Sequence, residues 1–96
     1  MQQQVDSFTD LRSSIALQRA RAGDLLGTAR HASMKERVVL ALRDLAEAEE
    51  WLRLEESDST TFIQIAHGAI RLARWRMDFV DESLRKRGPD ATIVFS

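Results

Sequence analysis

Few residues in this chain of 96 interrupt a helix, and this scarcity restricts its fold more than any other feature. The single proline is Pro89, and residues 28–67 contain neither glycine nor proline. Along these uninterrupted stretches, apolar residues recur at intervals of three and four, which is the period of an α-helix rather than of a strand. We therefore predict an all-α protein.

The first predicted helix spans residues 7–30. Its apolar stripe consists of Phe8, Leu11, Ile15, Ala22, Leu25, Leu26 and Ala29. Gln18 and Arg19 interrupt the stripe, and two serines and two glycines lower the helix propensity of this segment. Packing against other helices must therefore supply its stability.

The second predicted helix spans residues 33–56. It opens with the pattern of a capping box, in which Ser33 and Glu36 each accept the other's backbone N–H. Its stripe consists of Met34, Val38, Leu42, Leu45, Ala46 and Leu52. Glu49 falls inside the stripe, and a carboxylate there needs a partner or an altered pKa. We expect Glu49 to be hydrogen-bonded, or exposed where the stripe bends.

The third predicted helix spans residues 60–87. Its stripe consists of Phe62, Ala66, Ala69, Ile70, Ala73, Met77, Val80 and Leu84. Gly88 and Pro89 end it. Residues 89–96 form an extended C-terminal tail, for which three interpretations stay open: it folds back over an open end of the helices, it adds a strand to a partner's sheet edge, or it is disordered as chain ends often are.

The short linkers make consecutive helices antiparallel neighbours. The net charge is +1 over residues 1–32, −3 over residues 33–56 and +2 over residues 57–87, a distribution by which antiparallel helices select their neighbours. We predict one domain over residues 1–88, an antiparallel three-helix unit that associates into a larger helical bundle.

A second apolar line accompanies the stripe of the third helix. Ile65, Leu72 and Phe79 recur at seven-residue intervals, with Trp75 beside them, and Trp51 extends the apolar surface of the second helix. A helix that is apolar on more than one side is buried on more than one side. A unit of this size does not need both faces, so the surplus predicts a partner, most simply a second copy in a homodimer. Another protein would use the same surface.

Arg76 falls within this apolar arc and has two interpretations. Its stem lies along the core while its charge reaches water, or it forms an ion pair across helices or across subunits, with Asp44 and Glu47 as the nearest acids if the second and third helices are antiparallel. The function that these features favour is a non-enzymatic protein–protein interaction module: an adaptor, a chaperone-like protein or an inhibitor. The predicted interface consists of Trp51, Ile65, Leu72, Trp75, Arg76 and Phe79.

A nucleic-acid-binding regulator is the first alternative. Its contacts would come from Arg71, Arg74, Arg85, Lys86 and Arg87. The net charge of −1 disfavours it. In addition, Arg74 with Asp78, and Asp81 with Arg85, stand four residues apart and are expected to neutralise each other.

An enzyme centred on Glu49 and His67 is the second alternative. Folding the helices about their turns brings Glu49 level with His67 and with Ser14. Catalysis is disfavoured because His67 projects off the stripe and no loop suited to stabilising an oxyanion is visible. We expect no cofactor and no metal, since the chain has no cysteine, only two histidines and no metal-ligand spacing.

Neither a secretory signal nor an apolar run long enough to cross a membrane is visible, so we expect a soluble cytoplasmic protein without membrane partners. Twelve arginines against two lysines are typical of GC-rich genomes and suggest a bacterial or phage origin.

The run ALRDLAEAEEWLRLEES, followed by AHGAIRLA in the next helix, resembles the helical HEPN domains of toxin systems. HEPN proteins with RNase activity carry an arginine followed after four to six residues by a histidine. Neither His31 nor His67 has an arginine at that spacing, so the resemblance does not imply this activity, and we do not assign the chain to that family.

Overall fold

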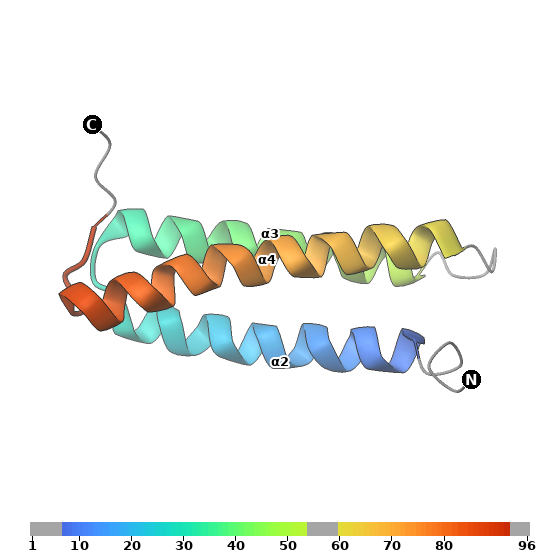
Figure 1. Cartoon of the computed structure of the whole chain (residues 1–96), viewed down its shortest axis with the longest axis horizontal. Helices are drawn as coiled ribbons and strands as arrows, with labels where there is room; N and C mark the ends of the chain where they lie inside the picture. Colours follow the sequence, from blue (N-terminus) through green and yellow to red (C-terminus); the bar gives the residue numbers. More distant parts are fainter. Residues whose placement is uncertain (1–6, 54–59, 93–96) are drawn as a thin grey trace.

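Three helices lie side by side in the computed structural model, which describes residues 7–53 and 60–92 (Figure 1). They are α2 (Ser7–Thr28), α3 (Ala32–Arg53) and α4 (Thr60–Arg87). Consecutive helices run in opposite directions, so α2 and α4 point the same way (Figure 1). The described ranges contain no strand. The protein is therefore an all-α three-helix unit, as predicted.

Each helix contributes one stripe of buried residues to a common core. The stripes are Leu11, Ile15, Gln18, Ala22 and Leu25 in α2, continued by Ala29 just after that helix, Met34, Val38, Ala41, Leu45, Ala48 and Leu52 in α3, and Ala66, Ile70, Ala73, Met77, Val80 and Leu84 in α4, where Ser83 is buried as well. In all three, steps of four and three residues alternate, which is the 3.5-residue repeat of helices packed knobs-into-holes.

The stripe predicted for α3 was partly wrong. Ala46 is exposed and Leu42 is half-buried, whereas Ala41 and Ala48 are fully buried. The 3.5-residue repeat explains the difference. The buried residues of α3 follow this repeat along one face of the helix, and the predicted residues Leu42 and Ala46 lie beside that face. Phe8 lies outside the described side chains.

Ion pairs join every pair of helices. Arg19 of α2 binds Glu49 of α3 at 2.6 Å, Arg21 of α2 binds Asp78 of α4 at 2.7 Å, and Arg76 of α4 binds Asp44 of α3 at 2.8 Å. Two of these three pairs place an α3 carboxylate against an arginine of another helix, in keeping with the negative charge of the second segment.

The cap of α3 is His31, not the predicted capping box at Ser33. The helix begins one residue earlier, at Ala32, and the backbone N–H of Ser33 donates to His31 Nδ1 at 3.1 Å. The N–H of Met34 donates to the His31 carbonyl oxygen at 3.1 Å. An imidazole nitrogen here takes the place of the usual N-cap oxygen.

The beginning of the tail folds back over the α2–α3 turn. The Arg30 N–H donates to the Pro89 carbonyl at 2.9 Å. This N–H would otherwise donate within α2 and extend it, so the bond explains why the helix ends at Thr28 instead of residue 30. Ala91 is buried, and Thr92 Oγ1 lies 3.1 Å from His31 Nδ1. Residues 54–56 and 93–96, to which the sequence assigned a helix end and the rest of the tail, lie outside the described residues.

Candidate functional site

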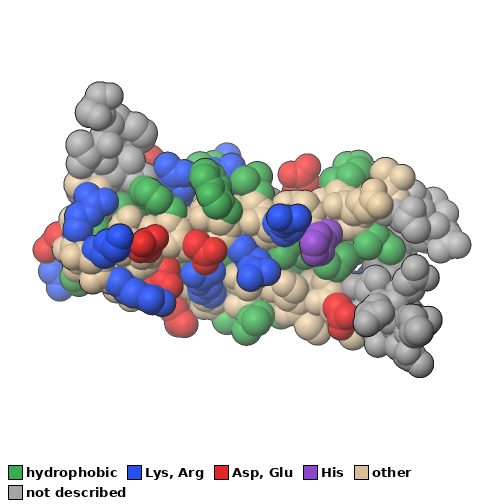
Figure 2. Space-filling view, in the orientation of Figure 1, with side chains coloured by type: hydrophobic (Ala, Val, Ile, Leu, Met, Phe, Trp, Pro, Cys, Tyr) green, Lys and Arg blue, Asp and Glu red, His purple; other side chains and the backbone are tan. Residues whose placement is uncertain are grey.

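The exposed apolar surface of α4 is the first candidate site. It consists of Ile65, Leu72, Trp75 and Phe79, which we call the α4 ridge. Trp75 is 62% exposed and the other three are 37–40% exposed. Leu40 of α3 is also exposed. In Figure 2, hydrophobic side chains form a broken line along the upper edge of the view, over α3 and α4.

The other two residues of the predicted interface make contacts within the chain. Trp51 is half-buried, with its ring centroid 5.2 Å from that of Phe62. Arg76 forms the cross-helix ion pair that was one of its two interpretations, and its partner Asp44 was one of the two acids named for it. Both members of this pair are largely buried, with side chains 21% and 15% exposed.

A cation also lies against the ridge. The Arg37 guanidinium carbon is 4.9 Å from the centroid of the Phe79 ring, a cation–π geometry. Two further exposed apolar residues, Leu17 (66%) and Val39 (42%), were not singled out from the sequence. Leu17 of α2 belongs to none of the apolar lines identified in the sequence, so no periodic pattern indicated it as a surface residue of interest.

The basic residues named for nucleic-acid contact differ in how they are neutralised. Arg85 pairs with Asp81 at 3.2 Å, as predicted, and Lys86 pairs with Glu82 at 3.0 Å. Arg71, Arg74 and Arg87 have no ion-pair partner within residues 7–53 and 60–92.

The predicted pair of Arg74 with Asp78 is wrong. Asp78 instead accepts a hydrogen bond from Arg21 of α2 at 2.7 Å. The neighbouring helix thus supplies a competing cation that the spacing within α4 did not reveal. As a result, the positive charge of Arg74 is not balanced by its own helix.

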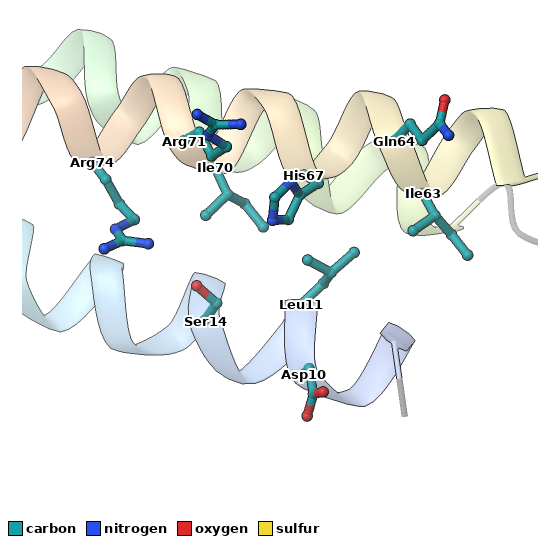
Figure 3. Close-up of a pocket in the computed structure, with 9 residues that line it drawn as sticks. All are labelled: Asp10, Leu11, Ser14, Ile63, Gln64, His67, Ile70, Arg71 and Arg74. Carbon is teal, nitrogen blue, oxygen red and sulfur yellow. The ribbon is translucent and has the colours of Figure 1, made fainter. Parts of the chain in front are cut away.

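A groove of about 480 Å³ between α2 and α4 is the second candidate site. Its lining consists of Asp10, Leu11 and Ser14 from α2, and Ile63, Gln64, His67, Ile70, Arg71 and Arg74 from α4. Figure 3 shows Arg74 and His67 directed from α4 toward α2, and the carboxylate of Asp10 directed away from α4. The arrangement combines an apolar floor with cationic and hydrogen-bonding side chains.

Glu49 lies in a different place from this groove. Its side chain is half exposed and accepts a hydrogen bond from Arg19 at 2.6 Å, so the expected hydrogen bond is formed. The predicted position of Glu49 inside the buried stripe is wrong, because the buried line passes through Ala48 and Leu52 instead. This hydrogen bond is the main cause of a lowered pKa of Glu49, to which the nearby positive charges also contribute. Glu49 lines a separate cavity with Arg12 and Arg19, whereas Ser14 and His67 line the α2–α4 groove. The cluster of Glu49, His67 and Ser14 is therefore not formed.

Two further properties bear on the kind of site present. Within the described ranges, no group of three His, Asp or Glu side chains is placed to hold a metal ion. None of the helices described contains an apolar run long enough to cross a bilayer. Comparison of the chain with models of protein families, with curated proteins and with solved structures finds no match.

Proposed function

We propose that the protein is a non-enzymatic protein–protein interaction module that forms a homodimer through the α4 ridge. The observation that carries the proposal is Trp75, a large aromatic side chain that is 62% exposed and flanked by Leu72 and Phe79. Isolated exposed apolar residues are ordinary, but an exposed line of them marks an interaction surface.

The spacing of the ridge supports a helix as its partner. Positions 65, 72, 75 and 79 fit the same 3.5-residue repeat as the buried stripes, and Gly68 occupies the remaining position of the repeat. The line is about 21 Å long from Ile65 to Phe79 at the rise of an α-helix. A second α4 would offer an identical line, as an interface with twofold symmetry requires.

The residue types also suit the centre of an interface. Tryptophan and phenylalanine bury large apolar areas, and aromatic residues are enriched among those that dominate binding energy. Leu40 of α3 is a further exposed apolar residue, and Arg37 above Phe79 adds a cation that fits the polar rim of such an interface.

The test is the mass in solution, measured by light scattering over a wide range of protein concentration. We expect a dimer for the wild type and a monomer for the double variant Leu72→Gln/Trp75→Gln. The matched control is Leu17→Gln, since Leu17 is exposed to a similar extent as Trp75 but lies on α2. This control is expected to remain dimeric.

A wild type that stays monomeric at every concentration would refute self-association. A dimer that survives the double variant but is lost in Leu17→Gln would move the interface to α2. Circular dichroism of each variant establishes that its helices are intact, so that a change in mass reports on the interface alone.

A further inference from the structure

We infer that the groove between α2 and α4 binds a small molecule that joins an anionic head group to a short aliphatic chain. The groove lies between α2 and α4, and none of the residues that line it belongs to the α4 ridge, whose Phe79 contacts Arg37 of α3. The inference therefore concerns a second surface and does not rest on the proposed dimer.

Arg74 provides the head-group site. Asp78, the acid four residues ahead of it, is engaged by Arg21 at 2.7 Å, and no other described carboxylate pairs with Arg74. Arg74 extends from α4 toward α2 (Figure 3). A guanidinium carries a permanent charge and five N–H donors in a planar fork, which matches two oxygens of a carboxylate or a phosphate. An anion placed here would gain charge-assisted hydrogen bonds without displacing an existing ion pair.

The neighbouring polar groups of the groove are suited to the same head group. His67 projects from α4 toward α2, and Ser14 lies on the opposite wall (Figure 3). A ring N–H and a hydroxyl are both hydrogen-bond donors to an anion. Asp10 also lines the groove, but its carboxylate, which would repel an anion, is directed away from α4 and from Arg74 (Figure 3).

The floor of the groove is apolar and provides the site for the chain. Leu11 and Ile70 belong to the buried core, and Ile63 is partly buried against it. The volume of about 480 Å³ falls within the range typical of small-molecule pockets. A ligand with an anionic head alone would leave this floor hydrated, so an attached aliphatic chain increases the buried apolar area.

A nucleic-acid strand fits these observations less well. It requires a track of free cations along its backbone. Arg85 and Lys86 are already paired with Asp81 and Glu82, and Arg87 lies about 20 Å along the helix axis from Arg74. The free charge next to the groove is thus local rather than extended.

The experiment titrates the full chain with sodium octanoate, kept below the concentration at which it forms micelles, and follows amide signals by NMR. We expect saturable shifts at residues that line the groove, centred on Ser14, His67 and Arg74. The neutral analogue 1-octanol is expected to bind more weakly, because it lacks the charge. Octyl phosphate compared with octanoate identifies which type of head group Arg74 prefers.

Variants of Arg74 test the assignment of the head-group site. Arg74→Gln is expected to weaken octanoate binding about tenfold or more, and Arg74→Lys, which keeps the charge but loses the planar fork, by less. The matched control is Arg87→Gln, which removes an equally unpaired arginine from the same helix outside the groove, and its affinity should equal that of the wild type.

Outcomes of three kinds would overturn the inference. The first is the absence of saturable shifts with octanoate and octyl phosphate in the wild type. The second is equal affinity of the wild type and Arg74→Gln, or shifts centred on the α4 ridge. The third is tight binding of a single-stranded oligonucleotide that weakens equally in Arg74→Gln and Arg87→Gln, which would assign these arginines to a nucleic-acid surface instead.

Discussion

Gln18 is the polar member of the α2 stripe, and we predict that its replacement by leucine stabilises the protein. The side chain is 8% exposed, and its Oε1 is buried without a hydrogen-bond partner in the described part of the chain. A buried amide oxygen that has left water and found no donor destabilises the folded state.

The magnitude follows from two favourable contributions and one that opposes them. The unsatisfied oxygen costs about 1–3 kcal/mol, and removing it recovers that amount. Burial of the added apolar surface of leucine contributes favourably at about 25 cal/mol per Å². An imperfect fit in a packed core offsets part of this gain, by about 1 kcal/mol for a swap of similar volume. The net expectation for Gln18→Leu is an increase of about 1–3 kcal/mol in the free energy of unfolding.

The assay is urea unfolding followed by circular dichroism, carried out in the Leu72→Gln/Trp75→Gln background. In that background the proposed dimer is absent, so the unfolding free energy does not depend on protein concentration. A gain of this size raises the melting temperature by about 4–8 °C for each kcal/mol in a domain of this length. Gln64→Leu, at an exposed position of α4, is the control and should change stability by less than about 0.5 kcal/mol.

A loss of stability in Gln18→Leu would refute the reasoning. It would mean that the amide makes hydrogen bonds in solution that leucine removes, so that Gln18 is a satisfied polar contact within the core. An unchanged value of m, with only the midpoint shifted, is needed for either conclusion, because m reports on the surface exposed during unfolding.

Three further predictions concern charges and glycines. Arg76→Leu should destabilise the fold by about 1–3 kcal/mol because it leaves the largely buried Asp44 carboxylate without its partner. The double variant Asp44→Leu/Arg76→Leu should recover most of this loss. Urea unfolding of the wild type, the two single variants and the double variant measures the coupling energy, and additive effects would contradict the prediction. The pKa of Glu49 lies below its ordinary value of 4.5, so the Arg19–Glu49 contact contributes stability above that pH and loses it as the pH falls through the lowered pKa. Arg19→Gln should return the pKa of Glu49 toward 4.5 in a carboxyl NMR titration, with a stability change at pH 7 below about 1 kcal/mol because both side chains are about half exposed; an unmoved pKa would be inconsistent with this cause. Gly68→Ala should stabilise the monomeric background by about 0.5–1 kcal/mol, because the added Cβ in mid-helix meets nothing within 4 Å. Gly88→Ala should destabilise it, because the φ of Gly88 is 85°. Melting temperatures that shift in the same direction in both variants would contradict these two predictions.

The helices were predictable from the sequence because helix signals are local. Apolar periodicity and the few breakers located all three elements, and Gly88 with Pro89 marked the end of α4 correctly. The choice of Leu42 and Ala46 over Ala41 and Ala48 failed for a physical reason. Both members of each pair are apolar, so hydrophobicity alone does not distinguish them, and the 3.5-residue repeat that does so follows from packing against the other helices.

Contacts between helices were harder to predict. By contrast, the pair of Asp81 with Arg85 was predictable because it depends only on spacing within α4. It is formed even though the Asp81 carboxylate also accepts a hydrogen bond from Arg21 of α2 at 3.4 Å. The cap of α3 was missed because the imidazole of His31, rather than a hydroxyl, accepts the Ser33 N–H. The α2–α4 groove was missed because it depends on which faces of two helices that are not consecutive in the sequence lie side by side.

Because Asp78 pairs with Arg21 of α2 and not with Arg74, the packing of α2 against α4 affects the inferred anion site, and a last prediction follows from this. Arg21 does not line the groove, but by binding Asp78 at 2.7 Å it leaves Arg74 free. In Arg21→Gln, Asp78 is released and stands four residues from Arg74, the spacing at which opposite charges pair on a helix. Octanoate must then compete with Asp78, so its affinity should fall about two- to threefold, as expected for an exposed pair at this spacing. Asp78→Asn added to Arg21→Gln removes the competing carboxylate and should restore the affinity of the wild type. If Arg21→Gln binds octanoate as the wild type does, the freedom of Arg74 does not depend on Arg21, and the link between the α2–α4 ion pair and the groove is wrong.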